Sequence, residues 1–274
     1  MSSHRILFVH GYPLDQHLWD GQSALATPDV ADSPGPNSTA SMASNPERAS
    51  GRPRAISTRT INLPGFGGRP PFEVQAETVT LTHYASAVRD EIRAWGDEPV
   101  VLAALSMGGY IAFECWRQFP EKIAALILCD TRAGADSPEG KEGRLAAIEK
   151  VRTGQADAMF DAMSKDLIAP SRRTDDAFRG RVLAMMHGAD PIGVQQALFA
   201  MRSRDDYGDE LAGITVPTLI VVGEHDALTP PSGAKAMADA IPNAKLVVIP
   251  DAGHLSPMER PEPVNDAIRG FLAG

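Results

Sequence analysis

Short, continuous apolar segments alternate with amphipathic segments along the chain. The apolar segments are rich in β-branched residues and occupy residues 6–10, 99–105, 124–130, 217–223 and 244–250. Strands that are buried on both faces of a parallel sheet have such unbroken apolar sequences, whereas half-exposed strands alternate apolar and polar residues. RTINLP at 59–64 is expected to form a further strand. The repetition of strand, helix and strand predicts an α/β fold with a mostly parallel, open sheet flanked by helices.

Two segments depart from this repetition. Residues 31–54 are rich in Ser, Pro, Gly and Asn and offer little to bury, which predicts a flexible surface loop. Residues 134–212 carry apolar residues at three- and four-residue spacing and show no strand pattern, as in FRGRVLAMMHG and VQQALFAMR. Because this segment falls between two predicted strands, we expect a core formed by 1–133 and 213–274 with an inserted helical cap formed by 134–212.

A serine stands between the apolar segment at 99–105 and a helical pattern. In ALSMGG, Ser106 is flanked by the small residues Ala104, Gly108 and Gly109. A serine that attacks a carbonyl occupies a sharp strand-to-helix turn, where the helix approaches the strand so closely that the flanking residues must be small. A serine that only caps a helix is the alternative, but the position directly after a buried strand favours a nucleophile.

Asp226 and His254 each follow a predicted strand by a few residues. Both therefore lie at the carboxyl edge of the sheet, which also carries Ser106. The order serine, acid, histidine is the order that accompanies this type of nucleophile turn. We predict that His254 transfers the proton as general base and acid, and that Asp226 orients its imidazole. Asp130, which ends another predicted strand, is the alternative acid.

A His-Gly pair follows the first predicted strand. The loop that it begins is expected to turn the backbone N–H of Tyr12 toward the carboxyl edge of the sheet. Together with the N–H of Met107, this group would stabilise the negative charge that develops on a carbonyl oxygen under attack. An ordinary glycine turn is the alternative. His10 is expected to brace the loop.

The chain resembles the α/β-hydrolase superfamily over nearly its whole length, especially its small esterase, enol-lactonase and cofactor-free haloperoxidase-like branch. The matching segments are HGYPLDQHLW (10–19), NLPGFGGRP (62–70), ALSMGGYIAF (104–113), GEHDALTPP (223–231) and DAGHLSPMERPE (251–262). The resemblance implies the α/β-hydrolase fold and the same nucleophile, acid, base and oxyanion donors. Relatives usually have Asp where Asn62 stands, a position that we interpret as structural.

Together these features predict a serine hydrolase that cleaves a small to medium carboxylic ester through an acyl-enzyme. A lactonase, a carbon–carbon bond hydrolase and a perhydrolase, in which peroxide replaces water, would use the same residues. A member that only binds a ligand is a further alternative, although such members often lack one of the three residues and this chain has them all. No metal or organic cofactor is expected.

The helical cap is expected to cover the site and to supply apolar side chains to a substrate pocket. Flexible thioethers suit an adaptable pocket of this kind. We assign substrate contacts to Met159, Met163 and Phe199 of the cap, and to Trp19 and Arg132 of the core. Arg132, just after a predicted strand, would either meet an anionic substrate or face solvent.

Composition narrows the range of partners. The chain has 26 Lys and Arg against 35 Asp and Glu, a net charge of -9, which disfavours nucleic acids and anionic membranes as partners. No segment reaches the ~18 apolar residues of a membrane span, and the start of the chain lacks the pattern of a secretory leader, so we expect a cytoplasmic protein.

Cys115 and Cys129 lie in apolar segments and are expected to be buried thiols. The expected partner is a small acyl compound; the oligomeric state stays open, a homo-oligomer included.

Overall fold

The computed structural model describes residues 4–27 and 55–274. At its centre is an open sheet of six parallel strands in the order β2-β1-β3-β4-β5-β6. The strands are β1 (His4–Val9), β2 (Ile56–Ile61), β3 (Val100–Leu105), β4 (Ile123–Cys129), β5 (Thr218–Gly223) and β6 (Ala244–Ile249). The predicted fold class is confirmed, because a parallel sheet flanked by helices carries a helical insertion. The predicted loop at 31–54 lies outside the described residues.

The burial of each strand follows from its place in the sheet. The central strands β3 and β5 are buried at every position, as their unbroken apolar sequences predict. The continuous apolar run at 244–250 predicts the same for β6, and this prediction is wrong. Strand β6 forms an edge of the sheet, and Val248 is 42% exposed. The RTINLP strand is present as β2, but it begins at Ile56 and forms the other edge.

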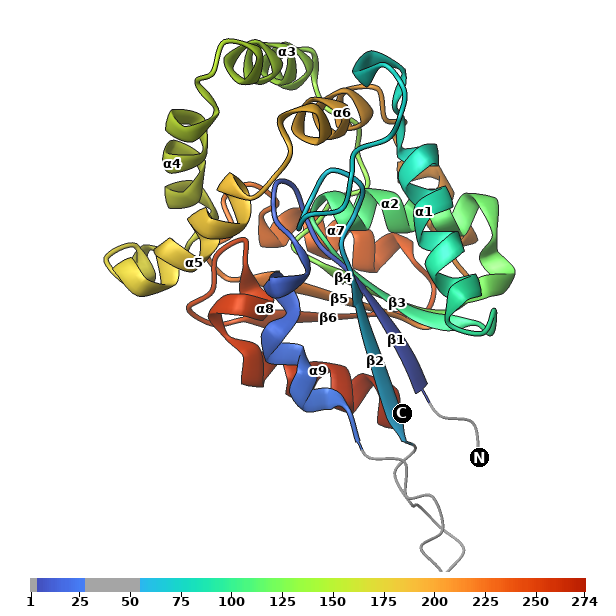
Figure 1. Cartoon of the computed structure of the whole chain (residues 1–274). Helices are drawn as coiled ribbons and strands as arrows, with labels where there is room; N and C mark the ends of the chain where they lie inside the picture. Colours follow the sequence, from blue (N-terminus) through green and yellow to red (C-terminus); the bar gives the residue numbers. More distant parts are fainter. Residues whose placement is uncertain (1–3, 28–54) are drawn as a thin grey trace, which may run out of the picture.

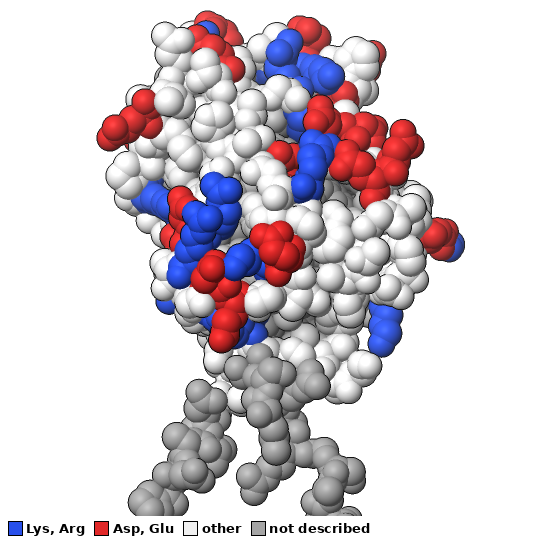
Figure 2. Space-filling view, turned by 90° about the vertical axis from the view of Figure 1, so that its right-hand side faces the viewer, with Lys and Arg blue, Asp and Glu red and all other residues white. Residues whose placement is uncertain are grey.

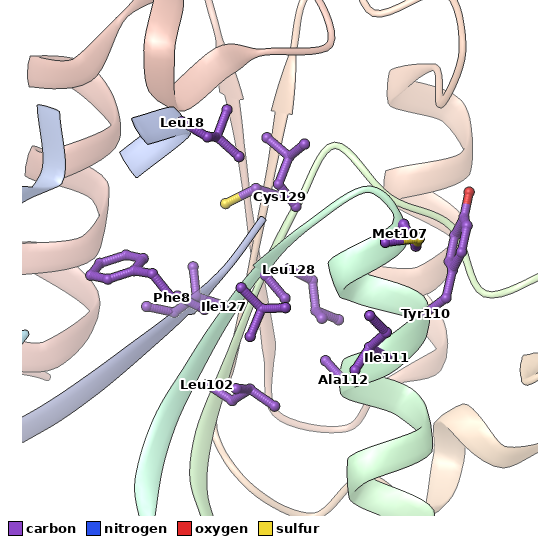
Figure 3. Close-up of a cluster of buried hydrophobic side chains, with 14 of the residues drawn as sticks. Phe8, Leu18, Leu102, Met107, Tyr110, Ile111, Ala112, Ile127, Leu128 and Cys129 are labelled. Atoms are coloured by element: carbon purple, nitrogen blue, oxygen red, sulfur yellow. The ribbon is translucent and has the colours of Figure 1, made fainter. Parts of the chain in front are cut away.

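Helices cover both faces of the sheet (Figure 1). One face carries α1 (Leu81–Ala94), α2 (Met107–Gln118) and α7 (Pro231–Ala240). The other carries η1 (Gln16–Leu25), α8 (Ser256–Glu259) and α9 (Pro261–Ala273), which contact one another. Figure 3 shows Ile111 and Ala112 of α2 pointing toward the sheet, where β4 carries Ile127 and Leu128. This packing fixes the start of α2 against the end of β3.

The insertion between β4 and β5 contains α3 (Pro138–Arg152), α4 (Ala156–Leu167), η4 (Pro170–Arg172), α5 (Asp176–His187) and α6 (Pro191–Arg202). These helices lie beyond the carboxyl ends of the strands (Figure 1). The backbone of α6 closely approaches the loop after β2, since a Cβ on Gly65 would lie 2.4 Å from the Cα of Gly193. The division into a core of 1–133 and 213–274 and a cap of 134–212 stays a prediction.

Short 3₁₀ segments complete the described chain: η2 (Ala76–Thr78), η3 (Pro120–Lys122) and η5 (Gly208–Gly213). Cys115 and Cys129 are buried free thiols, as predicted, and burial raises the pKa of both well above the usual value.

On the face drawn in Figure 2, basic and acidic side chains stand side by side among uncharged ones. No helix among residues 4–27 and 55–274 is long and apolar enough to cross a membrane.

Candidate active site

Ser106 occupies a sharp turn between β3 and α2. Its φ is 55°, a left-handed conformation that costs free energy for any residue with a Cβ. The turn brings α2 so close to the sheet that a Cβ on Gly108 would lie 2.6 Å from the carbonyl oxygen of Val9. A Cβ on Gly109 would lie 2.3 Å from the hydroxyl oxygen of Thr131. The two glycines after Ser106 are therefore required by packing, as the sequence predicts.

Ser106, His254 and Asp226 form a continuous chain of hydrogen bonds. The Nε2 atom of His254 lies 2.9 Å from the Ser106 hydroxyl oxygen, and its Nδ1 lies 2.9 Å from Oδ2 of Asp226. Asp226 and His254 are each 3% exposed. An imidazole that donates from Nδ1 to a carboxylate has Nε2 free to accept the proton of a hydroxyl group. The arrangement can therefore raise the nucleophilicity of Ser106.

Asp226 is held as a carboxylate by several donors. The backbone N–H groups of Leu228 and Thr229 donate to Oδ1, and the Thr229 hydroxyl donates to Oδ2. Burial alone would raise the pKa of Asp226, but the charge and hydrogen bond of His254 and the hydrogen bonds of Thr229 outweigh it and lower the pKa. The role of Thr229 was not predicted from the sequence. Its position three residues after Asp226 could have indicated that it hydrogen-bonds the acid.

The loop that carries His254 is attached to the helical insertion. The backbone N–H of His254 donates to the carbonyl oxygen of Leu167 at 2.9 Å. The buried carboxylate of Glu259 accepts from the N–H groups of Gly253 and Ala169, at 2.9 and 2.8 Å. These bonds connect the imidazole's own loop to the end of α4, so the insertion helps to position His254. Nothing in the sequence pattern indicated this role for Glu259.

The side chain of Asp130, the alternative acid, makes no hydrogen bond with His254 or Ser106 in the described structure. Its Oδ1 accepts from the N–H of Gly223 at 2.8 Å, and its Oδ2 accepts from the Ser256 hydroxyl at 2.5 Å. Burial, and then the nearby charge of Asp226, raises the pKa of Asp130 well above its usual range. The carboxyl group of Asp130 thus joins the end of β4 to the last residue of β5 and the first residue of α8, while Asp226 holds the imidazole.

The loop after β1 runs directly against Ser106. A Cβ on Gly11 would lie 3.1 Å from the Cβ of Ser106. The Ser106 N–H donates a hydrogen bond to the carbonyl oxygen of Cys129. The N–H groups of Tyr12 and Met107, in contrast, have no acceptor within the described chain. Two unused donors beside the serine are what an oxyanion site requires. Their role as oxyanion donors stays a prediction.

His10 braces this loop, as predicted. It is fully buried, and its Nε2 accepts from the backbone N–H of Leu63 at 3.0 Å. Its Nδ1 therefore carries the hydrogen and donates to the carbonyl oxygen of Gly11 at 2.9 Å. Burial lowers the pKa of His10 to about 4, although the bond to Gly11 acts in the opposite direction. His10 is consequently neutral near neutral pH.

The buried His10 makes stability depend on pH. An unfolded chain binds a proton at His10 below about pH 6.5, whereas the folded chain does so only near pH 4. The free energy of unfolding should therefore fall by about 3 kcal/mol as the pH drops through this interval. Urea denaturation of the wild type and of His10→Gln across the interval measures the effect. The variant should be less stable at neutral pH and show a shallower pH dependence; equal slopes would contradict the assignment.

A cavity of about 300 Å³ opens at Ser106 and His254. Of the predicted substrate contacts, Met163 and Arg132 line it. The other lining residues are Tyr12, Tyr110, Arg144, Leu167, Met201, Leu228 and Thr229. Arg144 was missed because a single arginine in a charged helical segment, GKEGR, carries no signal of its own.

Three predicted substrate contacts do not line this cavity. Trp19 is 1% exposed, and its ring packs 4.8 Å from that of Phe8, so it belongs to the core beneath η1. Met159 and Phe199 are partly buried and pack against the hydrophobic core instead. Helical spacing identified these residues as apolar and inward-facing, but the direction of each helix decides whether a side chain meets the cavity or the core.

A possible set of metal ligands lies outside the cavity. Among the described residues, Glu224, His225 and Asp251 place ligand atoms within 4.8 Å of one another, and all three are exposed. None of the three side chains belongs to the hydrogen-bonded chain at Ser106.

Comparisons with known proteins agree with the fold and the family resemblance. A family model described as the alpha/beta hydrolase family matches residues 6–267. A thermophilic esterase from Thermogutta terrifontis, solved with malate bound, is 35% identical with a TM-score of 0.82, over 99% of this chain and 90% of the esterase. An enol-lactonase from Burkholderia xenovorans LB400 has 21% identity and a TM-score of 0.81, over 100% of this chain and 93% of that one. A bromoperoxidase from Bacillus anthracis has 20% identity and a TM-score of 0.78, with the same coverage.

Proposed function

Since the chain belongs to the alpha/beta hydrolase family, we propose that it is a serine hydrolase that cleaves a small to medium carboxylic ester through an acyl-enzyme. The observation that carries the proposal is the hydrogen-bonded chain from the Ser106 hydroxyl through His254 to Asp226. The 35% identical esterase from Thermogutta terrifontis supports ester hydrolysis over other chemistries of the family.

The proposed acyl transfer uses these residues in turn. His254 removes the proton of Ser106 as its oxygen attacks the ester carbonyl, and Asp226 stabilises the resulting imidazolium. The N–H groups of Tyr12 and Met107 stabilise the oxyanion of the tetrahedral intermediate. His254 then protonates the departing alkoxide, which leaves an acyl group on Ser106. A water molecule, activated by the same imidazole, hydrolyses the acyl-enzyme and regenerates the serine.

The cavity sets the size of the substrate. Its volume of about 300 Å³ lies at the lower end of the range of ligand pockets, which favours short acyl and alcohol groups. Met163, Leu167 and Met201, all from the helical insertion, and Leu228 supply apolar surface. Long acyl chains do not fit this space without movement of the insertion.

A substrate panel tests this proposal. We expect wild-type protein to hydrolyse short p-nitrophenyl esters, with kcat/KM decreasing from acetate and butyrate to octanoate. Lactones, and acetate with added hydrogen peroxide, are measured in parallel, because ring opening and peroxide-dependent acyl transfer would use the same residues. Higher kcat/KM for a lactone, or turnover that requires peroxide, would replace the ester in the proposal. No turnover of any acyl compound would refute it.

A further inference from the structure

The wall of the cavity at Ser106 is positively charged. Arg132 and Arg144 line it, and no carboxylate is among its lining residues in the described chain. Guanidinium groups are positively charged in proteins, so this part of the wall is positive. The two arginines share the cavity with mostly apolar side chains and are 41% and 22% exposed, so a charge at their inner side interacts with them more strongly than it would in bulk water. An uncharged ester forms no ion pair with these two arginines.

A buried acid holds the two arginines in place. Asp136, whose side chain is 2% exposed, accepts hydrogen bonds from Arg132, Arg144 and Arg204. Burial would raise the pKa of Asp136, but Arg204 and Arg144 together lower it to about 2, so the carboxylate is charged. One negative charge thus faces three positive charges, and the cluster has a surplus of two.

Arg204 does not line the cavity, and all its nitrogens except the buried Nε donate within the described structure. Its side chain is completely buried and donates to the carbonyl oxygens of Met201 and Gly134 in addition to Asp136. It also lies over the ring of Tyr110, 4.2 Å from the centroid. Arg204 is therefore the arginine of the cluster that stays away from the cavity. Arg132 and Arg144 are the two that line it, and the cluster as a whole keeps its positive surplus.

The donors of these two arginines are only partly used. Arg144 donates to Asp136 through Nε, and neither of its terminal nitrogens has a partner in the described chain. Arg132 donates through Nη2, while its buried Nε has none. A third polar group is also unpaired: Tyr12 lines the cavity, is 8% exposed, and its buried hydroxyl has no hydrogen-bond partner among the described residues. Buried polar groups normally have partners, so the Tyr12 hydroxyl and the Nε of Arg132, which line the same cavity, point to a ligand.

We propose that Arg132, Arg144 and the Tyr12 hydroxyl form a subsite that binds a free carboxylate of the substrate, as in the half ester of a short dicarboxylic acid. The inference rests on the proposed function and adds to it the substrate class. Planar guanidinium groups match a carboxylate, and a tyrosine hydroxyl donates a further hydrogen bond to it. The bound carboxylate would hold the neighbouring ester carbonyl beside Ser106. Hydrolysis of a half ester with water then yields the diacid and the alcohol.

Two esters that differ only in the free carboxylate test the subsite. Monoethyl succinate is anionic, and diethyl succinate is the neutral match. Wild-type protein should hydrolyse the half ester with the higher kcat/KM. In Arg144→Gln the ratio of kcat/KM for the half ester to that for the diester should fall about 10- to 100-fold, mainly through KM, as expected for a lost charge-assisted hydrogen bond. Arg144→Lys should recover part of the ratio, because it restores the charge without the planar fork.

Controls separate this subsite from a structural effect and from the proposed function. Arg93→Gln removes the same charge from an exposed position on α1, outside the cavity, and should leave the ratio unchanged. Arg132→Gln provides a second variant should Arg144→Gln unfold. An unchanged ratio in a folded Arg144→Gln or Arg132→Gln variant overturns the subsite, even when ester hydrolysis persists.

A binding measurement decides the question without turnover. Titration of Ser106→Ala with succinate in a calorimeter should show binding, and the additional substitution Arg144→Gln should weaken it by a similar factor. Absence of ester hydrolysis with succinate binding intact would refute the proposed function and keep the carboxylate subsite. Failure of succinate to bind, together with equal kcat/KM for the two succinate esters, would refute the subsite and keep the serine hydrolase.

Discussion

Replacement of Ser106 by alanine should lower kcat for the best ester by about 10⁶-fold. The hydroxyl is the group that His254 contacts at 2.9 Å, and no other serine or threonine hydroxyl contacts the Nε2 atom of this imidazole in the described structure. The fold should be unaffected, because alanine has the same Cβ and meets the same constraint at φ 55°. Steady-state kinetics, with a thermal melt of the same preparation, measure both effects.

The matched control for this experiment is another serine hydroxyl on the same protein. Ser23 lies on the exposed side of η1 and donates only to the carbonyl oxygen of Asp20. Ser23→Ala should retain the wild-type kcat. Turnover by Ser106→Ala within tenfold of the wild type would show that a different group performs the attack.

The substitution Asp226→Asn should lower kcat by about 10⁴-fold, while Asp130→Asn should reduce it far less. Both residues are buried carboxyl groups at the carboxyl edge of the sheet, but only Asp226 accepts from Nδ1 of His254. Asparagine at 226 would present an amide to the imidazole and favour the tautomer with a hydrogen on Nε2, which cannot accept the serine proton. At 130, asparagine keeps an acceptor for the Gly223 N–H and tolerates the positive φ of that residue.

Steady-state kinetics of the two variants, each with a denaturation curve, distinguish the two acids. Asp130→Asn is expected to change stability more than kcat, because Asp130 joins three segments of the chain and makes no hydrogen bond with the imidazole. A larger loss of kcat in Asp130→Asn than in Asp226→Asn would reverse the assignment of the acid.

The positions of the backbone elements were predictable because they depend on local patterns. The unbroken apolar run before Ser106 and the glycines after it identify a buried strand and a tight turn from sequence alone. The same reasoning failed at β6, where an apolar run of equal quality lies at the edge of the sheet. Hydrophobicity reports that a strand packs against something, but the order of strands decides how much of it is covered.

The walls of the cavity were harder to predict, since they depend on contacts between distant residues. Arg144 and Arg204 meet Asp136 only because α3 and the end of α6 come together, and no spacing in the sequence reveals that meeting. Trp19 illustrates the same difficulty. It ends a segment that matches the family, yet its ring packs against Phe8 and does not line the cavity. Side-chain direction within a short 3₁₀ helix is not fixed by the sequence around it.

The activation of Ser106 by His254 is tested most directly by the site and rate of labelling with a fluorophosphonate. The reagent phosphonylates a serine whose proton is removed by a neighbouring base. The account predicts a single adduct on Ser106, located by peptide mass mapping, with labelling that is slower by orders of magnitude in a folded His254→Gln variant. An adduct on another residue, or equally fast labelling of His254→Gln, would contradict it.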